Sequence, residues 1–333
     1  MLTSAVLGTG SRTGGQLVLS SGLDERLGKP RGWLERTCGV TSRPMIAPGE
    51  SQESLGQLAA RAALEDAGLE PKDLDLILFA AAVGRQPIPA TAALIKRELG
   101  LEASPIPAFD INATCLSAVA AMDVADLYIS SGRASRVLIV ASEIATRALP
   151  WEEDPATAGL FGDGAAAIVM GASDSAPSAL RINHVLMETW AQGYDMCALA
   201  SGGTRYDFHR EPDAFAANSY FRMDGHALFK LTRAKLPEFI GRLLALSGWR
   251  QDEVTLVIPH QASPLALEHM IRKCGFARNK VVSTVRETGN LIAASIPATL
   301  DHARKQGRVR PGDKLLLVGT SAGVSLGGAS LQA

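Results

Sequence analysis

The sequence contains two similar segments about half a chain apart, and this internal repeat limits the folds that the chain can adopt. Residues 68–78 and 248–258 share one order: a glycine that ends a helix, a polar turn and a buried strand, with equivalent positions 180 apart. Residues 131–140 and 306–318 also share a glycine stop followed by an apolar strand. Two copies of one α/β unit are therefore expected, one in each half. Chance similarity between two strand–helix units is the alternative.

Helical patterns alternate with these strands. Apolar residues recur at helical spacing over 55–62, and Pro89 begins a second helical segment that Gly100 ends. The segment 116–127 is apolar on nearly every side, which is typical of a helix enclosed by protein. Strands that alternate with helices predict an α/β fold with a mainly parallel sheet.

The repeat extends this prediction to the whole chain. Because Ser295 lies 180 residues after Cys115, we expect a second enclosed helix just beyond Asn290. Two enclosed helices between two sheets make a five-layer αβαβα stack. We place the N-terminal half at residues 1–172 and the C-terminal half at residues 173–333.

Composition excludes several classes of function. The chain has 333 residues, of which 47% are hydrophobic, and 33 Lys and Arg residues balance 34 Asp and Glu residues. Such a balance gives no overall attraction for nucleic acid or for an anionic membrane. No uninterrupted apolar run of about 18 residues is present, and the N-terminus lacks the features of a signal peptide. A cytoplasmic protein without membrane insertion is expected.

The four cysteines are widely scattered, so the sequence predicts neither a disulfide framework nor a metal site. Cys38, Cys197 and Cys274 are interpreted as small buried apolar residues. Cys115 differs from them, because it lies where the strand-like run 107–111 meets the enclosed helix. A sulfur at a helix N-terminus faces unpaired N–H groups and the helix dipole, which favour a thiolate.

Two further segments carry polar side chains in small-residue surroundings. His260 follows a strand in Pro-His-Gln-Ala-Ser, and Asn290 lies in Thr-Gly-Asn-Leu-Ile. Alone, such a histidine is more often structural and a Gly-Asn pair is more often a turn. In the predicted stack both would lie at the same face as Cys115, where ligands of parallel sheets usually bind.

Seven local motifs occur in an order that resembles the thiolase superfamily, and specifically its β-ketoacyl-acyl-carrier-protein synthase III family, over nearly the whole chain. These motifs are Trp33 in Gly-Trp-Leu, Cys115 after Phe109-Asp110, the turn at 161–166, Phe229-Lys230, Pro259 to Ala262, Gly289-Asn290 and the glycine-rich hairpin at 323–328.

The resemblance implies a homodimer in which each subunit consists of two βαβαβαββ halves. The implied reaction is the condensation of an acyl primer with malonyl-acyl-carrier protein. The acyl carrier protein is then a partner, coenzyme A or phosphopantetheine thioesters are substrates, and no cofactor or metal is needed. Cys115 would carry the acyl group as a thioester. N–H donors from His260 and Asn290 would stabilise the enolate that decarboxylation forms, and the backbone N–H groups of Cys115 and Ala322 would form an oxyanion hole.

The resemblance also implies residues that bind the substrate or the carrier. Trp33 would stack on an adenine, although a core aromatic is an equal interpretation. Arg36 would face a phosphate, but the extra residue Cys38 alters its position. Ile88 would close the acyl pocket of the partner subunit, and its small size predicts a longer or branched primer. The remaining members of this set are Phe229, Lys230 at the carrier-protein position, Gln261 and Ser263.

Departures from the family pattern concern phosphates and the last loop. Pro264-Leu265 replaces an arginine-bearing stretch, and residues 154–158 contain no arginine, so phosphate binding is expected to be weaker. Ala322 stands where the family has glycine, so we expect it to adopt a conformation that glycine reaches more easily. The glycine-rich stretches at 161–164 and 8–14 are interpreted as a tight structural turn and a strand-to-loop turn.

Two other classes of function remain open. The first is an acyltransferase on the same scaffold, in which Cys115 passes its acyl group to a hydroxyl or an amine of a small metabolite. The second is a non-catalytic partner subunit, which would not require Cys115, His260 and Asn290 together.

Overall fold

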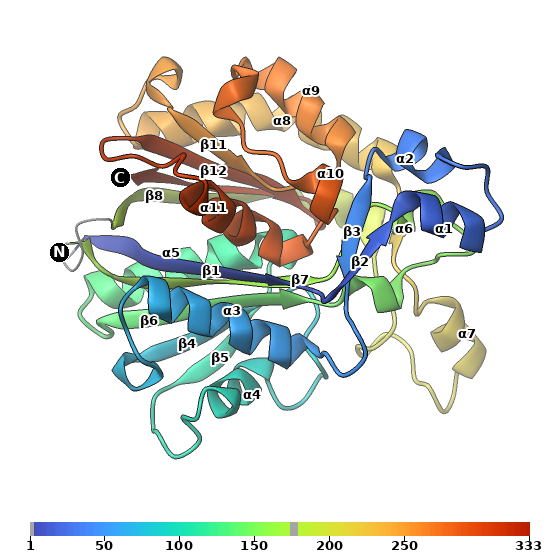
Figure 1. The fold of residues 1–333 in the computed structure, drawn as a ribbon, viewed down its shortest axis with the longest axis horizontal. Helices are drawn as coiled ribbons and strands as arrows, with labels where there is room; N and C mark the ends of the chain where they lie inside the picture. Colours follow the sequence, from blue (N-terminus) through green and yellow to red (C-terminus); the bar gives the residue numbers. More distant parts are fainter. Residues whose placement is uncertain (1–2, 174–178) are drawn as a thin grey trace.

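The computed structural model describes residues 3–173 and 179–333. Two βα halves pack against each other in five layers, as predicted (Figure 1). In the first half the strands are β1 (Ser4–Thr13), β4 (Leu76–Ala80), β5 (Ala108–Ile111), β6 (Arg136–Glu143) and β7 (Gly164–Ala172). In the second half they are β8 (Leu180–Thr189), β11 (Leu256–Pro259), β12 (Lys314–Ser321) and β13 (Ser325–Gln332).

Strand order is the same in both halves, which is the structural form of the sequence repeat. The first half runs β1-β7-β6-β4-β5 and the second runs β8-β13-β12-β11. In place of a fifth strand, the second half has a parallel bridge between Val257 and Val281. A short antiparallel pairing of Ala5 with Arg181 and of Val6 with Leu180 joins both halves into one nine-stranded sheet among the described residues.

The expectation of a mainly parallel sheet was wrong. Only β4 with β5, β4 with β6, and β11 with β12 pair in parallel, whereas β6 with β7, β1 with β7, β12 with β13 and β8 with β13 are antiparallel. In each half the last two strands in the chain pair with each other in antiparallel fashion, and in the first half only the short helical segments η3 (Ala145–Ala148) and α6 (Pro155–Ala158) lie between them.

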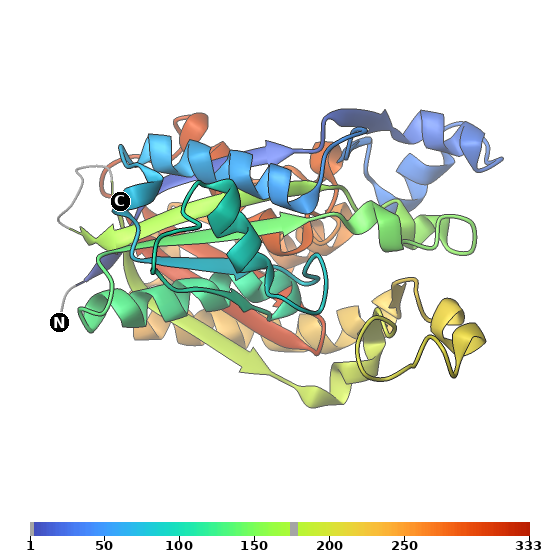
Figure 2. The ribbon, with the colours of Figure 1, turned by 90° about the horizontal axis from the view of Figure 1, so that it is seen from below.

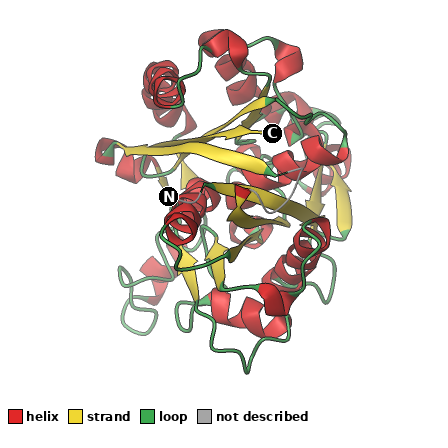
Figure 3. Cartoon of the chain, turned by 90° about the vertical axis from the view of Figure 1, so that its left-hand side faces the viewer, coloured by secondary structure: helices red, strands yellow, loops and turns green. Residues whose placement is uncertain are grey.

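Helices cover both outer faces and fill the middle (Figures 1 and 3). The outer helices are α3 (Gln52–Asp66) and α4 (Thr91–Glu98) on the first half, and α8 (Gly225–Leu246) and α9 (Pro264–Cys274) on the second. The middle helices are α5 (Ser117–Ser130) and α11 (Ser295–Lys305). None of the helices in the described parts of the chain has the length and apolarity needed to cross a bilayer.

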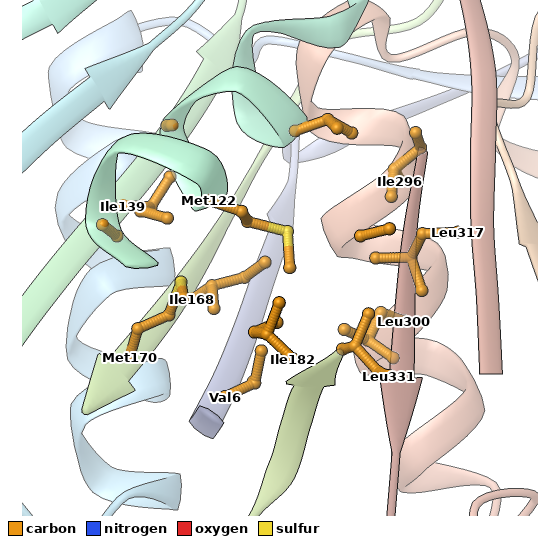
Figure 4. Close-up of a cluster of buried hydrophobic side chains, with 14 of the residues drawn as sticks. Val6, Met122, Ile139, Ile168, Met170, Ile182, Ile296, Leu300, Leu317 and Leu331 are labelled. Carbon is orange, nitrogen blue, oxygen red and sulfur yellow. The ribbon is translucent and has the colours of Figure 1, made fainter. Parts of the chain in front are cut away.

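The central core lies between the two halves and explains why α5 is apolar around most of its surface (Figure 4). Met122 of α5 and Leu300 of α11 meet Ile168 of β7 and Leu317 of β12, and all four side chains are buried. Burial of one such side chain contributes roughly 1.5–3 kcal/mol. The same packing therefore fixes how α5 and α11 lie between the halves.

Smaller elements gather at one end of the stack, at the right in Figures 1 and 2. This end group comprises β2 (Gln16–Leu19), α1 (Ser20–Arg26), α2 (Trp33–Cys38), β3 (Ser42–Met45), α6 (Pro155–Ala158), β9 (Cys197–Ala198), α7 (Pro212–Ala217), β10 (Arg222–Met223) and α10 (Val285–Thr288).

The glycine-rich stretch at 8–14 is not a strand-to-loop turn, because β1 continues through most of it. Gly8 and Gly10 allow α3 to approach the strand closely. An added Cβ would lie 2.4 Å from the Ala63 carbonyl oxygen at Gly8 and 2.4 Å from the Ala59 carbonyl oxygen at Gly10. These glycines serve helix–strand packing.

Candidate active site

Cys115 lies in a single 3₁₀ turn, η2 (Thr114–Leu116), between β5 and α5. Thr114 adopts a φ of 53°, which is uncommon for a residue other than glycine. The Asn112 side-chain oxygen accepts the Thr114 N–H at 2.9 Å, and Ser117 Oγ accepts the Ala113 N–H at 2.9 Å. Two polar side chains therefore hold the turn that presents the thiol.

The same turn recurs in the second half and carries Asn290. In η8 (Ile292–Ala294) the residue Ile292 has a φ of 50°, and its N–H donates to Asn290 Oδ1 at 2.8 Å. Ser295 Oγ accepts the Leu291 N–H at 3.1 Å. Asn290 is thus the second-half copy of Asn112, 178 residues later.

This register corrects one detail of the sequence repeat. Ser295 is equivalent to Ser117, whereas the equivalent of Cys115 is Ala293. The offset is 180 between β4 and β11 but 178 between the two turns, because the second half has two fewer residues between these elements. The predicted second enclosed helix nevertheless begins just beyond Asn290.

The glycine-rich turn after Leu160 holds the backbone of Asn290. The Asn290 N–H donates to the Leu160 carbonyl at 2.7 Å, and the Gly162 N–H donates to the Asn290 carbonyl at 3.2 Å. A Cβ on Gly162 would lie 2.3 Å from the Thr288 carbonyl oxygen. Asn290 Oδ1 is bonded to the turn and its backbone is fixed. No residue in the described chain bonds to Nδ2, so this group is free to donate to a ligand.

His260 directly follows β11 and is 7% exposed. Its backbone N–H donates to Val318 at 2.8 Å. Nδ1 is buried, and no polar atom of the described residues lies within hydrogen-bonding range of it. Burial lowers the pKa of His260 to about 4, so the imidazole is neutral at pH 7. Because a proton on Nδ1 would have no acceptor, the neutral ring carries its proton on Nε2.

The structure brings the three predicted residues to one place. A Cβ on Gly319 would lie 2.7 Å from His260 Cβ and 3.1 Å from Leu116 Cδ2, so the histidine and the Cys115 turn meet at this glycine. Ser321 Oγ of β12 donates to the Ala113 carbonyl at 2.8 Å. The turns η2 and η8 also pack against each other, which brings Asn290 to the same region.

The protonation state of Cys115 differs from the sequence prediction. Its side chain is half-buried, and the backbone N–H groups of Cys115 and Ala322 lie close enough to lower the pKa of the thiol. Desolvation outweighs them, and the neighbouring Glu143 and Cys197 act in the same direction, so the pKa of Cys115 is raised to about 12. The expected thiolate was wrong for the free protein, because burial is a larger effect here than the helix terminus.

Ala322 does not adopt the conformation expected from the sequence. A positive φ, of 124°, falls on Gly323, whereas the residues other than glycine with a positive φ in the described chain are Thr114 and Ile292. The glycine after Ala322 absorbs the strained part of the loop, so an alanine is tolerated at 322.

Phe229 and Lys230 lie in the second turn of α8. Phe229 lines a cavity of about 70 Å³ between α8 and α9, and His260 lies at the inner wall of this cavity. The Phe229 ring packs edge-on against His269, with 4.5 Å between the ring centroids. Lys230 is exposed to solvent. The predicted roles of these two residues stay predictions.

Gln261 has a structural role, which corrects its assignment to the substrate. It is 1% exposed, its Nε2 donates to the carbonyls of Pro259 and Val282, and its Oε1 accepts the N–H groups of Thr284 and Val285. All of its polar capacity is therefore used by the backbone. The sequence did not reveal this, because residues 282–285 are distant along the chain.

The other predicted substrate residues lie on several different elements. Ser263 caps α9 by accepting the Ala266 N–H at 3.1 Å. Trp33 is half-buried in the end group, with Lys29 Nζ 5.2 Å from its ring centroid. Arg36 is exposed and donates to the Arg31 carbonyl. Ile88 is 85% exposed. Their contacts with a substrate or partner stay predictions.

Two residues near Cys115 were missed. Glu143 ends β6 with 2% exposure, and Cys197 of β9 is 8% exposed. A glutamate that ends an otherwise apolar strand is a signal that sequence analysis can use. Cys197 has no comparable signal, because nothing in the sequence relates β9 to η2.

A five-layer stack of two duplicated halves, with a cysteine, a histidine and an asparagine where the halves meet, defines a protein of the thiolase superfamily. Residues 109–188 match the family model for 3-oxoacyl-(acyl-carrier-protein) synthase III, and residues 244–333 match the model for its C-terminal part. The chain belongs to the 3-oxoacyl-acyl-carrier-protein synthase III family.

Relatives cover the full length of the chain. It is 33% identical over 332 residues to β-ketoacyl-acyl-carrier-protein synthase III of Sinorhizobium medicae, covering 100% of both chains. Identity is 34% over 334 residues to the protein of the same name from Rhodospirillum rubrum, again covering 100% of both. The crystal structure of the Aquifex aeolicus synthase III aligns with a TM-score of 0.88 at 29% identity, covering 99% of this chain and 100% of that one.

Proposed function

We propose that the protein catalyses the decarboxylating condensation of an acyl primer with malonyl-acyl-carrier protein, in fatty acid or polyketide-type biosynthesis. The primer would arrive as a thioester of coenzyme A or of a carrier protein. The observation that carries the proposal is the convergence of an accessible thiol, two backbone N–H groups and two neutral side-chain donors. Full-length relatives that are named for this reaction support it.

In the first step Cys115 Sγ attacks the carbonyl carbon of the primer thioester. The thiol is neutral at pH 7, so it must lose its proton as the S–C bond forms. The primer's departing sulfur takes up one proton in the same step, so a neutral thiol is consumed and a neutral thiol is released, while His260 stays neutral. The backbone N–H groups of Cys115 and Ala322 would bind the oxyanion of the tetrahedral intermediate.

In the second step the malonyl thioester loses carbon dioxide and becomes an enolate. Its oxygen would accept hydrogen bonds from His260 Nε2 and Asn290 Nδ2. The enolate carbon attacks the acyl-Cys115 carbonyl, the C–S bond breaks, and the thiolate takes one proton from solvent. One 3-oxoacyl thioester, one carbon dioxide and the free thiol result, so atoms and charge balance.

Neutral donors suit this enolate better than a cation does. The low pKa of His260 keeps the imidazole from acting as a strong acid at pH 7. An imidazolium would readily protonate the enolate carbon, which would waste the malonyl unit as acetyl thioester. A neutral histidine beside an asparagine stabilises the charge and leaves the carbon free to react.

The test is release of carbon dioxide from carboxyl-labelled malonyl-carrier protein, measured together with formation of the 3-oxoacyl product. Condensation requires one carbon dioxide for each product and depends on the acyl primer. Transfer of the acyl group to a hydroxyl or an amine would instead release no carbon dioxide. A non-catalytic subunit would give neither product.

Three parts of the proposal concern the setting of the reaction. The carrier protein and a second copy of the chain are the proposed partners, and coenzyme A or phosphopantetheine thioesters are the proposed substrates, with no cofactor. Ile88, which is 85% exposed, would close the acyl pocket of the partner subunit. A cytoplasmic location remains an expectation from the sequence.

A further inference from the structure

Glu143 is a buried carboxyl group that the reaction scheme does not use. It is 2% exposed, and no Lys or Arg side chain of the described residues pairs with it. Its Oε1 accepts the Ala82 N–H at 2.6 Å, and the strand that it ends, β6, packs against η8 of the second half, so that the N–H groups of Val83 and Ala293 lie nearby. Burial of a carboxyl group without a cation is costly, so its retention requires a reason.

The three N–H donors come from two different loops. Ala82 and Val83 follow β4 in the first half and begin the segment that carries Ile88. Ala293 lies in η8 of the second half, in the turn that Asn290 begins. Cys115 lies close enough to Glu143 to sense its charge. One carboxyl group therefore joins the Asn290 turn to the half that carries the nucleophile.

A second contact between the halves occurs at the equivalent position of the second half. Ser321 ends β12 as Glu143 ends β6, and the two residues are 178 apart. Ser321 Oγ donates to the Ala113 carbonyl at 2.8 Å, in the turn that carries Cys115. In each half, the last residue of the next-to-last strand thus lies against the catalytic turn of the other half.

We propose that Glu143 is a positioning residue that holds the Asn290 turn in register with Cys115 across the boundary between the halves. The inference rests on the proposed condensation, because Asn290 acts in the decarboxylation step of that reaction. Glu143 itself contacts backbone groups and not the reacting atoms.

Glu143→Gln is the informative change because it keeps the size of the side chain. The amide oxygen can still accept the Ala82 N–H, but the NH₂ group then faces the remaining backbone donors. We expect this to disturb the packing of η8 against the end of β6. Misplacement of a catalytic group by about 1 Å can cost roughly a hundredfold in rate.

The test separates the two half-reactions. Acyl transfer to Cys115 is followed by intact mass in a single turnover, and decarboxylation is followed with labelled malonyl-carrier protein. We expect Glu143→Gln to slow decarboxylation by roughly tenfold to a hundredfold while acylation changes by less than about threefold. Asn290→Ala should slow the same step. A rate of decarboxylation in Glu143→Gln that stays within about twofold of the rate of the unchanged protein would overturn the proposal. Equal losses of rate in acylation and in decarboxylation would also overturn it.

Asp301→Asn is the matched control. Asp301 is also a buried carboxyl group, at 1% exposure, and it accepts hydrogen bonds from Thr9, Ser11 and Lys305. It lies on α11, away from the turns that carry Cys115 and Asn290. Loss of stability without a change in either half-reaction is expected. A selective loss of decarboxylation in this control as well would overturn the positioning role of Glu143.

A second readout does not depend on the proposed function. The ionisable groups that face the thiol are Glu143 and Cys197, and His260 is neutral. Removing the carboxylate should therefore lower the pKa of Cys115 and speed its alkylation by iodoacetamide at pH 9, whereas Asp301→Asn should not. If the unchanged protein shows no decarboxylation, the proposed function fails. Glu143 is still tested, since unchanged alkylation in Glu143→Gln would overturn its placement beside the thiol.

Discussion

Cys115 shows how burial and local hydrogen bonding compete at a single residue. Two backbone N–H groups favour the thiolate, whereas desolvation and the neighbouring Glu143 disfavour it and raise the pKa to about 12. The neutral thiol is therefore the resting state. Its activation must come with the substrate, because the thiol loses its proton only as the S–C bond forms.

His260→Ala and Asn290→Ala should each raise the barrier to decarboxylation by about 2.7–4 kcal/mol, because each removes one donor to the enolate oxygen. The pKa of His260 is about 4, so the imidazole should not titrate between pH 5 and 8. If the pH profile of kcat has an inflection between pH 5 and 8, the same inflection should therefore remain in His260→Ala. An inflection in this range that is lost in His260→Ala would contradict the assigned roles. Unchanged decarboxylation in either variant would also contradict them.

At the scale of elements, the two 3₁₀ turns explain why a duplicated fold has an asymmetric site. Both turns are held by an asparagine and a serine, and both contain one residue with a positive φ. The first turn places a cysteine where the second has Ala293. Asn290 thus occupies the position of the structural Asn112, and its Nδ2 group, to which no described residue bonds, is left for the proposed role in decarboxylation.

Gly162→Ala should disturb the Asn290 turn. The added Cβ would lie 2.3 Å from the Thr288 carbonyl oxygen, so the turn must shift, at a cost of about 1–3 kcal/mol. Gly241→Ala is the matched control, because no atom lies within 4 Å of its added Cβ and it lies inside α8. There, alanine should stabilise the protein by up to about 1 kcal/mol.

Urea denaturation measures both free energies of unfolding, and labelled malonyl-carrier protein measures decarboxylation. We expect decarboxylation to fall in Gly162→Ala and to stay unchanged in Gly241→Ala. Equal stability of the two variants would contradict the close approach at Gly162.

The sequence predicted the elements that carry the site but not the contacts between them. The repeat and the enclosed helix over 116–127 led to the stack, and Cys115, His260 and Asn290 were found from their local motifs. Glu143 was missed, and Gln261 was assigned to the substrate although it bonds to the backbone. Their partners lie on segments that are distant along the chain, and no local pattern reports such contacts.

At the scale of the whole molecule, the exposed residue Ile88 points to a second subunit. An isoleucine that is 85% exposed, near Val83 at 50% exposure, is accounted for if a partner covers this segment. We expect a dimer in light scattering and higher turnover with hexanoyl and octanoyl thioesters than with acetyl. Ile88→Phe should shift the preference toward short primers. A strict preference for acetyl in the unchanged protein would contradict the prediction.

Two buried groups should give the stability of the protein opposite slopes with pH. The pKa of Glu143 is raised from 4.5 to about 8 by burial, so its contribution is complete below pH 4.5 and is lost as the pH rises to 8. The pKa of His260 is lowered from 6.5 to about 4, so its contribution is lost as the pH falls from 6.5 to 4.

Each unit of pKa shift corresponds to about 1.4 kcal/mol. The free energy of unfolding of Glu143→Gln should therefore fall less between pH 5 and 8 than that of the unchanged protein. Parallel curves for the two proteins would contradict the raised pKa of Glu143.

The sequence reading of the whole molecule was correct in its layers and wrong in its strand directions. Composition and periodicity report which face of an element is buried, and this was enough for the five layers. The antiparallel pairs depend on how the last two strands of each half connect, which periodicity does not report. The two halves likewise join into one sheet through only two residue pairs, in which Ala5 and Val6 of β1 pair with β8.

The central claim is that Cys115 carries the acyl group and gives it up only to a decarboxylated malonyl unit. The most direct measurement is the intact mass of the protein after incubation with acyl thioesters and then with malonyl-carrier protein. We predict one acyl adduct that Cys274→Ala retains and Cys115→Ala lacks, discharged with one carbon dioxide for each product. An adduct that persists in Cys115→Ala, or discharge without carbon dioxide, would contradict the account.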